Sequence, residues 1–293
     1  MKHKTVITTL SILIALFSII AASTGIFSDK GTGPFLHETV RGDTVLIYGK
    51  GLYAHMSADV AVQGIAQDYI TLFLGVPLLL FGLARARNNS LRGTILQTGT
   101  VFYFLLTYLF YLAMAMYNAM FPVYILLLAS SLFCLLLLLI PFDTDRFRES
   151  IKSEAVYKQA GIFLIINAGM ISLLWLSVII PPVLEGTIIP KQVQHYTTLI
   201  VQGFDLAIFL PLAFVSGWMA VKKQIYGYLF TTVYMIFLSI LMLALVSKIL
   251  FMAAEGASVI PVIFIMPPIA GIAIYFSWRL LGNLHKEKTP EEA

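Results

Sequence analysis

The chain is built from apolar runs of about 20 residues that alternate with short charged or turn-forming segments. As a helix, a run of this length matches the hydrocarbon core of a bilayer, which is about 30 Å thick. The sequence therefore predicts an all-α integral membrane protein with about eight transmembrane helices. The predicted spans are 5–27, 61–83, 95–117, 121–141, 160–182, 198–220, 226–250 and 259–281.

The composition excludes an ordinary water-soluble fold. Hydrophobic residues make up 59% of the chain and charged residues 12%, against about 45–50% and 25% in soluble domains. The net charge of +4 is spread over loops and tails, so no basic face for nucleic acid is expected and the lipid bilayer is the predicted partner. The single cysteine, Cys134, lies inside an apolar run, which rules out a disulfide framework or a thiolate metal cluster within one chain and favours a packing role.

The distribution of Lys and Arg predicts the orientation. Segments 84–94, 142–159 and 221–225, together with both tails, carry most of the cations, whereas the opposite loops carry few. The positive-inside rule places the cation-rich side, with both termini, in the cytoplasm. The first span also fits a cleavable signal peptide, because Lys2 and Lys4 precede an apolar stretch that ends in small residues.

Two short motifs recur at a constant spacing and suggest an internal duplication. Val62-Gln63-Gly64 returns as Val201-Gln202-Gly203, and Phe121-Pro122 returns in kind as Ile260-Pro261. Parallel repeats of this sort occur in transporters, although coincidence among apolar strings explains the pattern too. The expected organisation is a first four-helix half (1–145), a cytoplasmic linker (146–157), a second half (158–285) and a charged cytoplasmic tail (286–293).

The largest difference between the two halves is the first outer loop, residues 28–60. Extended segments at 38–40 and 44–48 flank Arg41-Gly42-Asp43, a pattern that predicts a small β-hairpin lid. An adhesion role for this tripeptide is disfavoured, because three residues recur readily by chance.

Common catalytic motifs are absent from the sequence. It contains no phosphate loop, no HExxH, no GxSxG and no dinucleotide fingerprint, so we assign no catalytic residue and no cofactor. His37, His55 and His195 share the outer side, where three imidazoles suit a metal, but solvated loop histidines are far commoner and no metal site is predicted.

Ionisable and amide side chains within or beside the spans are the candidate functional residues. A charge near the bilayer centre costs about 2.5–3.5 kcal/mol on insertion scales, so it tends to face the protein interior and to find a partner. The alternatives are that the aspartates anchor helix starts, that the lysine snorkels to the headgroups and that the tyrosines form an interfacial belt. The candidate ligand-binding set is Asp68, Asp205, Gln63, Gln67, Gln202, Asn118, Tyr111 and Lys248.

Several of these segments resemble one group of bacterial multi-pass membrane proteins that has no assigned function. The resemblance rests on Tyr48-Gly-Lys-Gly-Leu-Tyr53 through Gln67-Asp68, on Ser90-Leu-Arg-Gly93, on Tyr117-Asn118 and on Gln202-Gly-Phe-Asp205. It covers most of the chain with short motifs. It implies a bacterial plasma membrane location and no catalytic residue.

The leading hypothesis is binding or transport of a small molecule or ion through a polar cavity in the outer leaflet. The first alternative is a membrane-embedded enzyme or redox partner that acts on lipid or quinone, and the second is a non-catalytic accessory subunit. The shape of the cavity discriminates between them: a transporter needs a path to both sides, an enzyme needs an opening toward lipid, and an accessory subunit needs neither.

Overall fold

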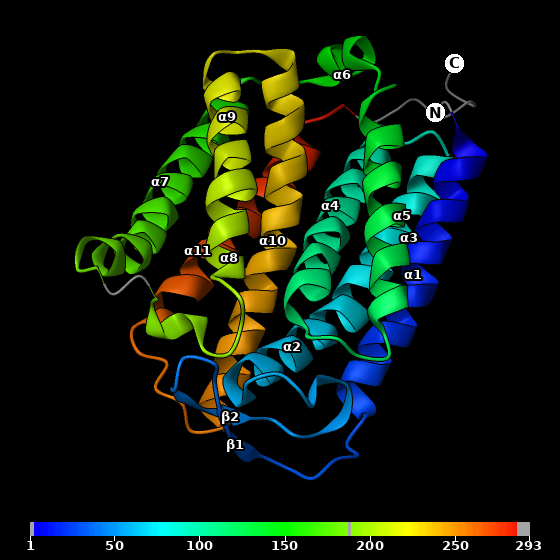
Figure 1. Ribbon diagram of the computed structural model, residues 1–293. Helices are drawn as coiled ribbons and strands as arrows, with labels where there is room; N and C mark the ends of the chain where they lie inside the picture. Colours follow the sequence, from blue (N-terminus) through cyan, green and yellow to red (C-terminus); the bar gives the residue numbers. More distant parts are fainter. Residues whose placement is uncertain (1–2, 187–188, 286–293) are drawn as a thin grey trace.

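The computed structural model describes residues 3–186 and 189–285, and that part of the chain contains eight helices long and apolar enough to cross a membrane (Figure 1). The all-α membrane fold is thus confirmed, and the chain is a multi-pass integral membrane protein. The spans are α1 (Lys4–Phe27); α2 (Ala58–Ile70), η2 (Thr71–Gly75) and α3 (Val76–Arg87) as one continuous helix; α4 (Leu91–Met114); α5 (Phe121–Leu139); α7 (Ala155–Leu184); α8 (Ile200–Phe204), η4 (Asp205–Phe209) and α9 (Leu210–Val221) as another; α10 (Ile225–Ala254); and α11 (Val262–Gly282).

The helix ends define two faces of the bundle (Figure 1). The terminal face holds the start of α1, the end of α11 and the short helix α6 (Thr144–Ser150). The hairpin face, opposite, holds the strands β1 (Phe35–Glu38) and β2 (Thr44–Ile47), the 3-10 turn η1 (Gly51–Tyr53) and the 3-10 turn η3 (Lys191–Val193).

The hairpin in the first loop is antiparallel and pairs Phe35 with Ile47 and Glu38 with Thr44. The first strand ends earlier than the sequence pattern suggests. Thr39 instead opens the turn: its N–H donates to the Asp43 carbonyl, and its own carbonyl accepts from the N–H of Gly42, which has a φ of 85°. Only glycine adopts that backbone conformation without strain.

The bundle consists of two groups of helices that meet along α4 and α10. The helices α1 to α5 pack on one another, as do α7 to α11, and α4 and α10 lie side by side at the centre (Figure 1). The contact is close because Gly99 has no side chain: a Cβ atom there would lie 2.6 Å from Cβ of Ile236. Small residues permit such close helix packing in membranes, where no hydrophobic force drives helices together.

Each half contains one π-turn in its second helix, followed by a proline. The π-turn η2 precedes Pro77, and the π-turn η4 precedes Pro211 at the matching place. Proline has no N–H to donate and crowds the preceding turn, and a π-turn is a common local adjustment in such helices. The same deviation from the α-helix therefore occurs in both halves.

A close contact at a glycine occurs in both halves, and it can be used to align their residues. A Cβ atom on Gly93 would meet Arg85 and Ala86, and one on Gly227 would meet Met219 and Ala220. Gly93 and Gly227, like the first residues of the two π-turns, are separated by fewer residues than the two Val-Gln-Gly motifs.

In this register Thr71 corresponds to Asp205, and Asp68 corresponds to Gln202. The two Val-Gln-Gly motifs align Gln202 with Gln63 instead. The helix that precedes the π-turn has 13 residues in α2 and 5 in α8, so the two units differ in length at this end.

Candidate functional site

A cavity of about 300 Å³ lies where the two halves meet, in the part of the bundle nearer the hairpin face. Its walls come from α2, α4, α7, the α8–η4–α9 helix, α10 and α11. Most lining side chains are apolar: Met56, Leu106, Phe110, Met114, Leu174, Phe209, Leu238, Leu241, Met242, Leu245, Met266 and Ile269. The polar lining is confined to a few groups, which include Gln63, Gln67, Tyr111, Asn167, Trp175, Asp205 and Lys248.

Asp205 is positioned by the π-turn η4, of which it is the first residue. Its Oδ2 accepts a hydrogen bond of 2.8 Å from Nε1 of Trp175 on α7. Trp175 was not among the residues selected from the sequence. The signal was present, because an indole N–H in an apolar span needs an acceptor.

Lys248 enters the cavity from α10, the helix after Asp205. In the described part of the chain its ammonium has no hydrogen-bond partner, and it lies more than 4.0 Å from every carboxylate oxygen. It interacts electrostatically with both Asp205 and Asp68. The cavity therefore contains a cation with two anions nearby and no direct ion pair, an arrangement that leaves the donors of Lys248 unused.

Asp68 lies behind the cavity wall, and its side chain is 1% exposed. Its Oδ2 accepts a hydrogen bond of 2.5 Å from Tyr53, and its Oδ1 lies 2.9 Å from the Tyr111 hydroxyl. Both tyrosines line the cavity whereas Asp68 does not. The aspartate therefore acts on the cavity through these hydroxyls and through its charge.

Gln67 lines the cavity and carries a buried acceptor without a partner. Its Nε2 donates to the Tyr103 hydroxyl at 2.8 Å and to Thr107 Oγ1 at 3.2 Å. Its Oε1 is buried and has no hydrogen-bond partner. A buried acceptor without a donor costs about 1–3 kcal/mol, and a ligand donor in the cavity would remove that cost.

The remaining sequence candidates lie at different places. Gln63 lines the cavity and bonds back to the Asp59 carbonyl at 3.3 Å. Gln202 is half-buried and does not line the cavity. Asn118 lies beyond the end of α4 at Met114 and caps a turn, with its Oδ1 accepting from the Met120 N–H at 2.9 Å.

Asn167 of α7 is a second lining residue that sequence reasoning missed. Its side chain is 9% exposed, and the structure gives it no hydrogen-bond partner among the described residues. An amide in an apolar span is itself a signal of an interior position, so the sequence held enough information to select it.

The loops of the hairpin face join the two halves beside the cavity. Arg41 donates to the carbonyl oxygens of Gln194 at 3.0 Å and Tyr196 at 3.2 Å. A nitrogen of the His195 ring lies 3.0 Å from the His55 carbonyl, and the rings of His37 and His195 meet edge to face at 6.3 Å. Among residues 3–186 and 189–285, no group of three side chains is placed to hold a metal ion.

Comparison of the chain with protein-family models, with curated proteins and with solved structures found no match. The function therefore has to be argued from the cavity and its side chains.

Proposed function

We propose that this chain is a bacterial plasma-membrane protein that binds a small amphipathic molecule in the cavity between its two halves. One observation supports this most directly. Asp205, Lys248 and Gln67 all face the same cavity, and each keeps hydrogen-bonding capacity that the fold leaves unused. Buried polar groups are nearly always satisfied, so three incompletely satisfied groups around one cavity favour a ligand that completes them.

The apolar walls limit the class of ligand. A site of this type, with a few polar groups in a mostly hydrocarbon lining, is typical of small-molecule pockets. The polar end of the ligand would contact Lys248 and Asp205, and its hydrocarbon part would lie against the Met, Leu and Phe side chains. A bare divalent cation fits less well, since Ca²⁺ takes six to eight oxygen ligands and few oxygens line this cavity.

Transport requires a path to both faces, and aromatic side chains at the α4–α10 contact pack together beside the cavity wall. Phe102 contacts Phe237 at 4.4 Å and Phe209 at 6.0 Å between ring centroids, and Phe209 is part of the cavity wall. A transport cycle would have to separate these rings. We therefore propose ligand binding as the function, and transport only if these rings separate during a cycle.

An enzyme acting on lipid or quinone is the second candidate, and the position of α11 favours it. Met266 and Ile269 of α11 line the cavity, and most of that helix is exposed on the outside of the bundle. The helix α11 thus borders both the cavity and the outside of the bundle, which suits lateral entry of an amphipathic substrate.

Thermal unfolding in detergent with a panel of amphipathic carboxylates, amines and quinones tests the proposal. A ligand at 100 times its Kd stabilises the fold by about 2.7 kcal/mol. Lys248→Met or Asp205→Asn should weaken the affinity for that ligand at least tenfold. Leu241→Trp, which fills the cavity, should abolish it, whereas Leu173→Trp on the 71% exposed position of α7 should not. A ligand effect that survives Leu241→Trp, Lys248→Met and Asp205→Asn unchanged would refute the site.

A further inference from the structure

A second, smaller pocket lies on the terminal face, far from the cavity described above. Its volume is about 160 Å³, and it forms where the linker between α6 and α7 meets the turn between α9 and α10. The side chains that give it its chemistry are Arg148, Lys152, Ser153, Glu154, Lys223 and Tyr228.

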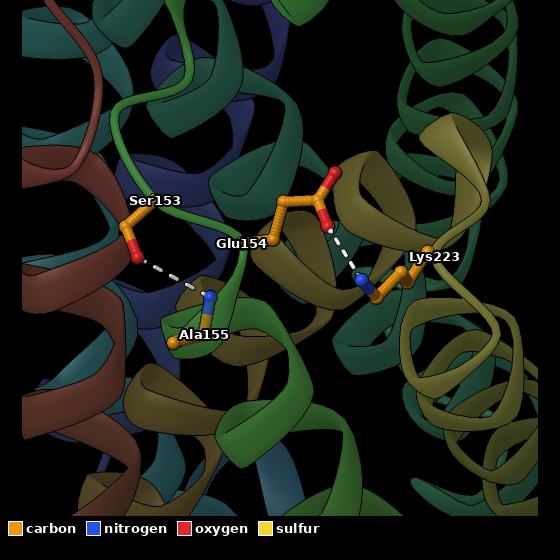
Figure 2. Close-up of polar contacts among 4 residues, drawn as sticks. All are labelled: Ser153, Glu154, Ala155 and Lys223. Atoms are coloured by element: carbon orange, nitrogen blue, oxygen red, sulfur yellow. Dashed lines mark hydrogen bonds and ion pairs between the residues drawn. The ribbon is translucent and has the colours of Figure 1, made fainter.

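Positive charge exceeds negative charge in this pocket. Lys223 pairs with Glu154 at 3.3 Å (Figure 2), and this neutralises the one carboxylate of the lining. Lys152 donates to the Gly282 carbonyl at 3.0 Å and keeps its charge. Arg148 is exposed and has no hydrogen-bond or ion-pair partner among the described residues. Two cations therefore remain without a counter-ion.

The pocket lies beside the N-terminus of a long helix, whose N-cap residue Glu154 is part of the lining. The helix α7 has 30 residues and begins at Ala155, whose N–H donates to Ser153 Oγ at 3.3 Å (Figure 2). The next two amides, of Val156 and Tyr157, have no acceptor in the part of the chain that the structure describes. The positive end of the helix dipole and free N–H groups together favour an anion.

Tyr228 provides an independent indication of a ligand. Its side chain is 3% exposed, its ring stacks on Tyr157 at 4.5 Å, and its hydroxyl has no hydrogen-bond partner. Glu154 acts on this hydroxyl, but its carboxylate is paired with Lys223 and makes no hydrogen bond of 3.5 Å or less to the hydroxyl. The Tyr228 residue lines the pocket, so an acceptor inside the pocket would satisfy the hydroxyl.

We infer that this pocket binds a phosphate group, either the headgroup phosphate of an anionic phospholipid or a soluble phosphate. A phosphate has several strong acceptor oxygens that point in different directions, and this lining offers a guanidinium, an ammonium and a tyrosine hydroxyl, with the free amides of the α7 N-terminus next to it. Because α7 and α10 both begin here, the pocket lies at the end of the apolar spans, where headgroups are found.

The full chain in a non-ionic detergent, with the bound species counted by native mass spectrometry and the unfolding temperature measured, tests this site. The probes are phosphatidylglycerol, phosphatidylcholine as the zwitterionic comparison, and inorganic phosphate. Binding of phosphatidylglycerol alone identifies the headgroup as the source, and binding of inorganic phosphate with similar affinity identifies a soluble phosphate. Either result supports the site, and no preference for phosphatidylglycerol over phosphatidylcholine together with no phosphate binding overturns it.

Variants separate the contributions of the lining. Arg148→Gln should weaken binding of the effective probe about tenfold, and Tyr228→Phe, which removes one oxygen from a buried ring, should weaken it severalfold. Lys158→Gln is the matched control, because it removes a positive charge from an exposed position in the first turn of α7 that does not line the pocket. Unchanged affinity in both Arg148→Gln and Tyr228→Phe refutes the site.

Loss of the fold does not obscure the result. Arg148 is exposed, so its replacement should leave the unfolding temperature without probe within about a degree of the wild type. If Tyr228→Phe destabilises the chain, Arg148→Gln and Lys152→Gln alone decide the question.

Discussion

Gly25 of α1 lies directly against the carboxylate of Asp68: a Cβ atom built on Gly25 would be 1.9 Å from Asp68 Oδ2 and 2.8 Å from the Tyr53 hydroxyl. The glycine makes room for the hydrogen bond between Tyr53 and Asp68. Because these two groups are fixed by each other and by Tyr111, they have little freedom to move aside.

Gly25→Ala should therefore destabilise the protein by about 1–3 kcal/mol, the usual cost of overpacking a filled interior. Thermal or denaturant unfolding in detergent measures the loss. Gly169→Ala is the matched control, since it lies in another spanning helix and no atom lies within 4 Å of its built Cβ. Equal effects of the two substitutions would show that the contact with Asp68 is not what requires glycine.

The loop contact at His195 predicts a dependence of stability on pH. Burial lowers the pKa of His195 below its usual value near 6.5, the neighbouring His37 lowers it further, and the His55 carbonyl and Asp59 act in the opposite direction. The folded state thus prefers the neutral ring. The contribution of neutral His195 to the free energy of unfolding is fully present above about pH 6.5. It is lost as the pH falls from the unfolded-state pKa through the folded-state pKa.

The unfolding temperature of the wild type should fall between pH 7.5 and 5, and His195→Gln should make that dependence shallower. His285→Gln, at an exposed position on the terminal face, should leave the slope as it is. A slope that is the same in wild type and His195→Gln would show that other groups account for the dependence.

The sequence predicted the spans well and the site only in part, for different physical reasons. Apolar length is a property of each segment alone, so the ends of α1 and α5 were found within two residues. The direction of a side chain also depends on local backbone deviations. Pro211 indicates a disturbed helix, but it does not show that the disturbance is a π-turn or that this turn begins at Asp205.

The sequence also did not show that Asp205 lines the cavity whereas Asp68 is sealed behind its wall. Both are single acids near the start of a helix of similar composition. What separates them is tertiary packing: Tyr53 and Tyr111 both donate hydrogen bonds to Asp68, whereas among the described residues the Asp205 carboxylate accepts one hydrogen bond, from Trp175. Residues far apart in the chain supply these partners.

The proposed orientation places the terminal face in the cytoplasm, since Arg85, Arg87 and Arg92 lie on that face. Single cysteines at Val40 and Asn88, in a Cys134→Ala background, test it in intact cells with a membrane-impermeant maleimide. Both positions are exposed, Val40 at the tip of the hairpin and Asn88 at the end of α3. We expect labelling at Val40 and protection at Asn88 until the cells are opened, and the reverse pattern would invert the topology.

The coupling between Lys248 and Asp205 gives the sharpest test of the cavity. The two groups are more than 4.0 Å apart and interact through a mostly apolar cavity, where screening by water is weak. Lys248→Met should leave Asp205 with the Trp175 N–H as its one direct partner among the described residues. The carboxylate then stays buried without a nearby cation, and the variant should lose stability.

Adding Asp205→Asn removes the charge that Lys248 had compensated, so the double variant should be less destabilised than the sum of the two single variants by about 0.5–2 kcal/mol. Denaturant unfolding of the four proteins in one detergent measures this coupling. Lys222→Met combined with Asp205→Asn is the control cycle, because Lys222 lies over the Trp218 ring at the far end of α9, and its cost should simply add. Additivity in the Lys248 cycle as well would mean that the two charges do not act on each other, and the cavity would then lose the feature that favours a ligand with a charged end.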